Sequence, residues 1–431
     1  MEKTKQSFNM DSVNSKPNPS FNFVKFILSV LNLFAATFGV GSTGLPEKAV
    51  KAGTLGFIIS YVIALCSMYL ILDYLLYFSD EHGFTNYVDL YKVIGGEGVK
   101  KIILLFFLIT NIGTLLFASN TFNNLLNRVA IYMECLNSVT SKGSLFFLVL
   151  VVFLLTPLNI KRKLEGFGWI SYVSFTTASV VIILLIRTIM SKYEFAFNDV
   201  PIENKKILEL SEVINPLNLV DSYFYCMFCL AIQTSYMDIY QSTANKTKSS
   251  FKVMTIGFLV VMTIKYLSFG LLGKEAFSMK KESLYGGEQF LTLFSKTKDI
   301  FIIVCTLFMI FAAIACFLFT YKATKENIGL MLFGQKYWDD KKDLNSINIS
   351  LTLFIVTTVT LTSSAFIVAN IPGLTIINYV VTLICPIVFM ILPFYAYYSA
   401  KKSIVALVFM IMNIVFYLIN VYEMVKGIIS N

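Results

Sequence analysis

Eleven segments of this chain are long and apolar enough to cross a lipid bilayer as helices, and polar loops separate them. A helix needs about 20 mostly apolar residues to span the hydrocarbon. Unbroken apolar runs such as 301–319 exclude an outer-membrane barrel, whose strands would alternate apolar and polar residues. The fold class is therefore all-α, in a protein that crosses the membrane many times. The expected spans are 23–46, 54–78, 100–126, 144–160, 168–190, 213–240, 251–273, 299–321, 348–370, 373–397 and 403–425.

The composition and the domain organisation agree with this fold class. Of 431 residues, 56% are apolar and only 14% are charged, whereas about a quarter of the residues in soluble domains are charged. Residues 1–22 are polar and predict a disordered tail. The remainder, 23–426, is expected to form one transmembrane domain. Its helices 1–5 occupy about 23–190, helices 6–10 about 213–397, and an eleventh helix about 403–425.

The basic residues set the expected orientation. The short loops at 161–166 and 399–402 are rich in Lys and Arg, and such loops face the cytoplasm. We therefore expect a cytoplasmic N-terminus. The net charge of +9 then reflects orientation in the membrane, and nucleic-acid binding is not expected.

The residues needed for enzymatic chemistry are scarce. The chain has one histidine, His82, and no HExxH, GxSxG or Walker-type motif. Six of its seven cysteines fall in expected spans, where cysteine behaves as a small apolar residue. We predict no enzyme activity, no cofactor and no metal site.

The first span contains an interruption of its helix. Gly39, Val40, Gly41, Ser42, Thr43 and Gly44 precede a proline within the apolar segment. Broken backbone at membrane depth occurs only where it is buried in protein or lines a watery cavity. The free N–H groups of such a break can bind a carboxylate. Close helix packing is the competing interpretation of the glycines, and Pro46 together with the two hydroxyl residues favours the break.

The sixth span carries a polar cluster at 233–235, which includes Gln233 and Thr234. If the first ten helices form two halves of five, this span corresponds to the first, and transporters built from inverted repeats interrupt both. Exposed carbonyl groups near 230–233 would accept hydrogen bonds from an ammonium group. A free amino acid carries both charges and matches the two breaks.

Three segments resemble the amino acid/auxin permease family of the amino acid, polyamine and organocation superfamily. GVGSTGLPEKAVKAGTLGF (39–57) is similar to the first-helix signature of that family. The end of the sixth span with the basic loop at 245–248, and SFGLLGKEAF (268–277), are similar to the ends of its sixth and seventh helices. The resemblance implies a leucine-transporter-like fold of two inverted five-helix repeats plus one helix. It also implies alternating-access transport of amino acids. We expect neutral substrates and a plasma or vacuolar/lysosomal-type membrane.

The resemblance also implies roles for individual residues. Residues 39–43 would contact the substrate carboxylate, Gln233 and Thr234 would lie in the sixth-helix break, and the third helix would form the opposite wall. That helix carries a group of polar side chains, which are candidates for lining the pathway or for bridging helices instead. They are Thr110, Asn111 and Thr114, with Ser119 and Asn120 beyond them.

The coupling ion is expected to be a proton, or absent, rather than sodium. Sodium needs oxygen ligands, and this chain has alanines where sodium-coupled members often carry Asn or hydroxyl residues. These alanines are Ala35, Ala312, Ala313 and Ala315. Glu47 and Asp238 are candidate proton carriers, whereas Arg187 and Lys265 are interpreted as charges that extend toward the headgroups.

Two other functions fit the same spans. One is a membrane sensor or scaffold that binds an amino acid without moving it, and the other is an ion channel, suggested by the polar third span. The expected partners are an amino acid substrate, a co-transported proton and the lipid bilayer. No feature of the sequence indicates a particular oligomeric state.

Overall fold

The computed structural model describes residues 23–37, 42, 44–83, 87–132, 168–190, 216–242, 248–277, 300–333, 345–370 and 382–430. Every element in these ranges is a helix, as the apolar pattern predicts. Six of the described helices contain stretches long and apolar enough to cross a membrane. The helices are α1 (Phe23–Thr37), α2 (Leu45–His82), α3 (Asp89–Tyr132), α5 (Gly168–Met190), α6 (Pro216–Leu230), α7 (Gln233–Ser242), α8 (Lys248–Phe277), α9 (Ile300–Phe333), α11 (Asn345–Asn370), the π-helix η6 (Ile387–Ile391), α13 (Leu392–Lys401) and α14 (Ile404–Ser430).

Ten of the eleven expected spans coincide wholly or partly with these helices. The fourth, 144–160, lies outside the described residues, as does the tail 1–22. A short helical stretch at 382–386 leads directly into η6 and α13, so that the tenth span contains one wide π-helical turn. Nothing in the apolar pattern of this span predicted the wide turn.

The first span is interrupted where the glycines predict. Helix α1 ends at Thr37, and α2 begins at Leu45 with a proline in its first turn, a favourable position for proline. The expected end of the span at residue 46 is wrong. The chain stays helical to Ala52, and Gly53 (φ 75°, ψ 164°) then turns it into the second span. Only glycine adopts these dihedral angles readily, so Gly53 marks the true boundary.

The sixth span is also interrupted. Helix α6 ends at Leu230, and α7 begins at Gln233 after the two non-helical residues Ala231 and Ile232. The polar cluster therefore forms the first turn of α7. The predicted break is confirmed, although neither glycine nor proline produces it.

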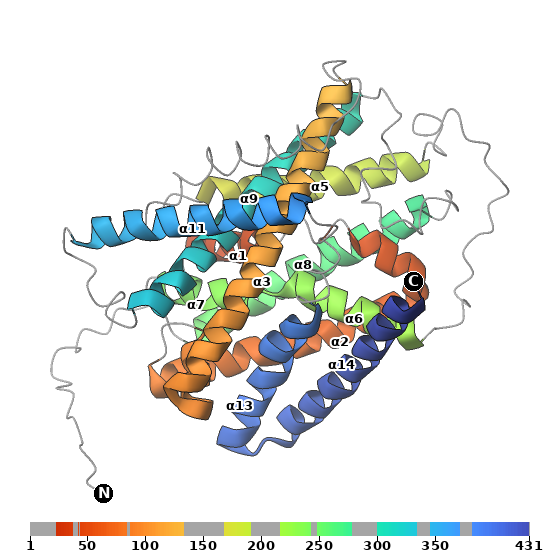
Figure 1. The fold of residues 1–431 in the computed structure, drawn as a ribbon. Coiled ribbons are helices and arrows are strands. Elements are labelled where there is room, and N and C mark those ends of the chain that lie inside the picture. Colours follow the sequence, from red (N-terminus) through yellow and green to blue (C-terminus); the bar gives the residue numbers. More distant parts are fainter. Residues whose placement is uncertain are drawn as a thin grey trace, which may run out of the picture.

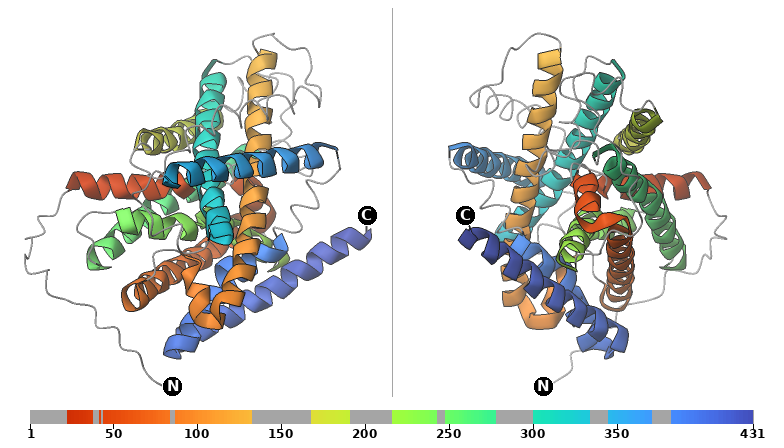
Figure 2. Two further views of the ribbon diagram at one scale, coloured as in Figure 1. Left: turned by 60° about the vertical axis from the view of Figure 1, so that its left-hand side comes forward. Right: turned by 90° about the vertical axis from the view of Figure 1, so that its right-hand side faces the viewer.

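Two groups of helices cross each other in the molecule (Figures 1 and 2). In the first group, α2 packs against α6 and α8, and α1 packs against α8. In the second group, α3 runs beside α9, and α11 contacts both. Helix α5 contacts α1, α8 and α9, and so lies where the groups meet. Each interrupted helix belongs to the first group.

Two glycines of α8 allow it to approach α2 closely. A Cβ atom on Gly273 would lie 2.3 Å from Cγ of Pro46, and one on Gly270 would lie 2.5 Å from the ring of Phe57. Small residues at such spacing let membrane helices pack tightly. The segment SFGLLG, noticed in the sequence for its family resemblance, therefore has a packing function.

Candidate functional site

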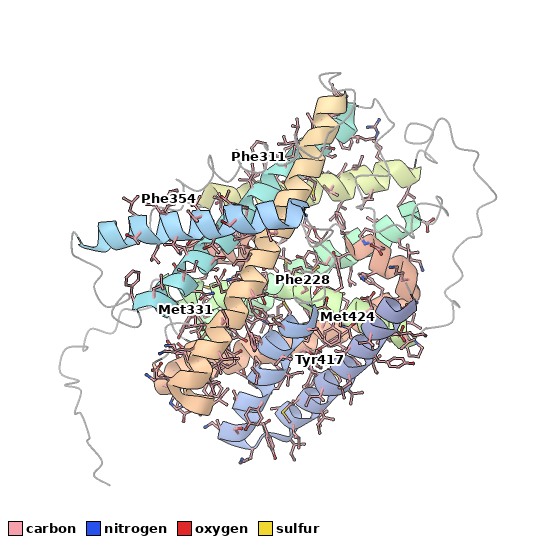
Figure 3. The ribbon with its side chains drawn as sticks, in the orientation of Figure 1. Phe228, Phe311, Met331, Phe354, Tyr417 and Met424 are labelled. Carbon is pink, nitrogen blue, oxygen red and sulfur yellow. The ribbon has the colours of Figure 1, made fainter. Side chains whose placement is uncertain are left out.

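A cavity of about 440 Å³ lies between the two groups of helices. Pockets for small molecules range from about 300 to 1,000 Å³. The first group contributes side chains from α1, α2, α6 and α7, and the second group contributes them from α3 and α9. Figure 3 shows Phe228, one of the lining residues, near the middle of the molecule. The apolar and aromatic lining comprises Phe224, Tyr225, Met227, Phe228, Phe319, Phe389 and Met390, among others.

Helix α3 presents a polar row to this cavity. Thr110, Asn111 and Thr114 all line it. The Thr114 hydroxyl donates to the Thr110 carbonyl at 3.0 Å, and the Cys385 thiol approaches the Thr110 hydroxyl at 3.8 Å. Asn111 is only 7% exposed, and its amide nitrogen has no hydrogen-bond partner among the described residues. Since an unpaired buried donor is costly, Asn111 is suited to meeting an acceptor on a ligand.

An ion pair forms another part of the wall. The ammonium group of Lys48, on the second turn of α2, lies 2.7 Å from the carboxylate of Asp221 on α6. It also lies 5.2 Å from the centre of the Tyr225 ring. The Lys48 side chain is 16% exposed and that of Asp221 is 44% exposed, so Asp221 is the more accessible partner. These two are the only Asp, Glu, Lys or Arg residues in the described lining.

The ends of both interrupted helices reach the cavity. Thr37 at the end of α1 lines it, as do Ala231 in the gap between α6 and α7 and Ser235 in α7. The Tyr266 hydroxyl of α8 lies 3.2 Å from the Thr37 carbonyl and 3.1 Å from the Cys229 carbonyl. One tyrosine therefore holds the ends of α1 and α6 together beside the cavity.

The π-helix η6 forms a further part of the wall. A π-turn leaves backbone carbonyls without their usual helical partners, and here side chains bond two of them. The Gln233 amide donates to the Phe389 carbonyl at 3.3 Å. The hydroxyls of Tyr91 and Tyr87 lie 2.6 Å and 3.1 Å from the Val388 carbonyl. The beginning of α7, the first turn of α3 and the segment before α3 are thereby joined to η6.

A family model for transmembrane amino acid transporter proteins matches residues 24–430. The chain belongs to this transmembrane amino acid transporter family. Among curated protein sequences, none matches the chain.

Solved transporter structures share the fold of this family member. MhsT, solved in complex with L-phenylalanine, is similar at a TM-score of 0.60 and 13% identity, covering 93% of this chain and 99% of that one. A sodium-coupled sialic acid symporter in a substrate-bound, outward-open state has a TM-score of 0.56 and 14% identity, covering 84% and 76%. The expected leucine-transporter-like fold is confirmed.

The structure places some of the predicted binding residues and leaves others outside its described part. Gly39, Val40, Gly41 and Thr43 lie outside the described residues. Ser42 is buried, and Gly44 precedes α2, where an added Cβ would lie 2.1 Å from the Tyr225 hydroxyl. Gln233 does not line the cavity but contacts its wall through Phe389.

The side chains of several other predicted residues lie outside the described part of the structure. Thr234 is the second residue of α7, and its side chain lies outside the described part, as do those of Ser119, Asn120 and Ala35. The polar row of α3 is therefore represented by its first three members. No pattern in the sequence indicated Lys48, because a lysine next to a glutamate at the beginning of a helix is typical of a solvated surface.

Several charged residues within the helices have specific partners. Glu47 pairs with Lys51 at 2.7 Å, and Asp73 pairs with Lys252. The Arg187 guanidinium lies 5.1 Å from the centre of the Phe301 ring. The Asp238 side chain lies outside the described part. Lys265, which was expected to extend toward the headgroups, contacts the hydroxyl of Ser179, halfway along α5.

Proposed function

We propose that this family member transports neutral amino acids across the membrane by alternating access. The cavity between the two groups of helices carries the proposal, since the ends of both interrupted helices reach it. A site placed between two bodies can open to either side when one body rocks against the other. Membership of the amino acid transporter family supports an amino acid as the substrate.

The charge of the lining supports a neutral substrate. Lys48 and Asp221 pair with each other, so a charged substrate side chain would have to break this ion pair to find a partner. The aromatic and methionine side chains around the cavity favour a large apolar substrate side chain. MhsT, of the same fold, was solved with L-phenylalanine, an amino acid of this class.

The backbone breaks are proposed to hold the two charges of the amino acid. In this proposal the N–H groups of 39–44 bind the carboxylate, and the break before Gln233 and Thr234 receives the ammonium group. Asn111 would supply an additional donor. Gly41→Val should abolish uptake, because its side chain would occupy space that the substrate needs.

The proposed coupling is to protons, or the transport is facilitative, rather than driven by sodium. Ala312, Ala313 and Ala315 are buried on α9 and offer no side-chain oxygen. We also propose a cytoplasmic N-terminus, from the basic loops, and a plasma or vacuolar/lysosomal-type membrane.

The test is uptake by purified protein in proteoliposomes. Radiolabelled amino acids are screened for counterflow against an internal pool, and then for accumulation under separate sodium and pH gradients. Counterflow of L-phenylalanine or L-leucine is the expected result. Binding without counterflow would identify a sensor instead, and substrate-independent single-channel currents would identify a channel.

A further inference from the structure

Lys265 lies inside the apolar stretch of α8, closer to its end than to its beginning. It is ten residues from the end of the apolar stretch Lys248–Glu275, which corresponds to about 15 Å along a helix. The hydrocarbon core is about 30 Å thick. Its amine contacts the hydroxyl of Ser179, which lies eight residues from either end of the apolar stretch Ser171–Arg187. Both residues of this contact therefore lie within the apolar stretches of their helices.

The surroundings of this amine differ from those of Lys248 and Lys252 on the same helix, whereas Lys274 also contacts a hydroxyl, that of Thr54 at 3.0 Å. The Lys265 nitrogen lies 4.6 Å from the centre of the Phe175 ring, and no described carboxylate forms an ion pair with it. Lys252 and Lys248 on the same helix pair with Asp73 and Asp80 of α2. Lys265 has a hydroxyl and an aromatic face in place of a carboxylate.

Among the described helices that pack against α8 or α5, no charged side chain forms an ion pair with Lys265. Helix α5 carries only Arg187, which stacks on Phe301. Helix α1 carries only Lys25, and α9 has no charge before Lys322. On α2, Glu47 pairs with Lys51, Lys48 pairs with Asp221 of α6, and Asp73 pairs with Lys252. On α8 itself, Lys274 and Glu275 lie at the end of the helix.

An amine in this position can change its protonation without losing its partner. An isolated ammonium at membrane depth costs several kcal/mol, and a facing aromatic ring offsets part of that cost. The Ser179 hydroxyl can accept a hydrogen bond from an ammonium and can donate one to a neutral amine. We propose that Lys265 is the group that binds and releases the coupled proton. This inference depends on the proposed transport function.

Two contacts join Lys265 to the candidate substrate cavity. The Phe175 ring packs edge-on against Phe34 of α1 at 5.4 Å, three residues before Thr37. The residue after Lys265 is Tyr266, whose hydroxyl holds the ends of α1 and α6. A proton gained or lost at Lys265 therefore acts beside the residues that fix both helix ends.

The experiment compares exchange with accumulation in proteoliposomes, with L-phenylalanine as the probe. Wild type, Lys265→Gln and Lys265→Arg are measured, and Lys252→Gln serves as the control on the same helix. Counterflow needs no net proton movement, so all four proteins are expected to exchange substrate within about threefold of one another per folded molecule. Accumulation driven by a pH gradient should fall at least tenfold in both Lys265 variants and persist in the control.

The arginine variant sharpens the assignment. Arginine keeps the positive charge but does not release its proton in proteins, so charge alone cannot restore coupling. If Lys265→Gln does not fold, Lys265→Arg alone provides the comparison with wild type. Gradient-driven accumulation by either folded Lys265 variant at the wild-type level would overturn the proposal, as would a wild type that exchanges but ignores pH. A wild type without any exchange would instead refute the transport function itself.

Discussion

The ammonium group of Lys48 lies 2.7 Å from the carboxylate of Asp221, and this pair joins the beginning of α2 to α6 at the wall of the cavity. Replacing either residue alone leaves a partly buried charge without its partner. Lys48→Met and Asp221→Asn should each lower the unfolding temperature in detergent, and the double variant should recover part of the loss. We expect a coupling free energy of about 1 kcal/mol, since Asp221 is partly exposed.

The ion pair between Glu47 and Lys51 is the matched control for this comparison of single and double variants. It joins residues one turn apart on the same helix, and the Lys51 side chain is 43% exposed. Its coupling should be smaller, about 0.3–0.5 kcal/mol. Strictly additive effects of Lys48→Met and Asp221→Asn would show that their contact does not stabilise the protein.

Gly273→Ala should destabilise the protein by about 1–3 kcal/mol, because its methyl group would overlap the rigid ring of Pro46. Gly98→Ala on α3 is the control. Its added Cβ would meet no atom within 4 Å, and alanine favours a helix over glycine by up to about 1 kcal/mol. Denaturation of both variants in detergent measures the difference, and equal stability of the two would contradict the packing of α8 on α2.

Asn111→Leu should raise the KM for substrate about 3- to 10-fold, which corresponds to the loss of one hydrogen bond. The unfolding temperature should not fall, since the amide nitrogen of Asn111 has no partner among the described residues. Uptake kinetics and thermal unfolding measure the two effects separately.

Asn413→Leu is the control, for which we expect lower stability and an unchanged KM. Asn413 is buried, accepts a hydrogen bond from the Tyr223 hydroxyl at 2.7 Å and donates one to the Phe409 carbonyl at 2.8 Å. Its loss should lower stability by about 1–3 kcal/mol and leave KM unchanged. An unaltered KM in Asn111→Leu would remove Asn111 from the proposed binding site.

Phe228→Ala should change selectivity by enlarging the cavity. We expect the kcat/KM ratio of L-tryptophan to L-phenylalanine to rise about tenfold, since small differences in fit within an apolar pocket change discrimination by such factors. Phe311→Ala is the control, because Phe311 is 49% exposed on α9 and does not line the cavity (Figure 3). Competition uptake with both amino acids measures the ratio, and equal shifts in the two variants would contradict the placement of the substrate.

The helical breaks were predictable to different degrees from the sequence. The break in the first span is indicated by Gly39, Gly41, Gly44 and Pro46, because the backbone preferences of glycine and proline oppose a helix. The second, at Ala231 and Ile232, has no such residues, and only the polar cluster after it gave a signal. Gly53 lies between the expected spans 23–46 and 54–78, and no sequence pattern indicates that it is one non-helical residue between two helical stretches.

Contacts between distant segments could not be predicted in the same way. Lys48 and Asp221 are 173 residues apart, and no residue near either of them in the sequence indicates that they form an ion pair. Phe224 and Phe228 line the cavity, but an apolar residue in a membrane helix can equally face lipid or protein. The contact of Lys265 with Ser179 was not predictable for a related reason, because the position of Lys265 along α8 does not reveal which residue it faces.

The wide turn of η6 determines which way α13 faces. A π-turn accommodates one more residue than an α-turn, and each residue of an α-helix advances the direction of the side chains by about 100°. Downstream of it, the Tyr397 ring stacks on Tyr74 with the centroids 3.6 Å apart. Shortening η6 by a single residue would rotate Tyr397 off Tyr74, so the rotational phase of the tenth span depends on that one inserted position.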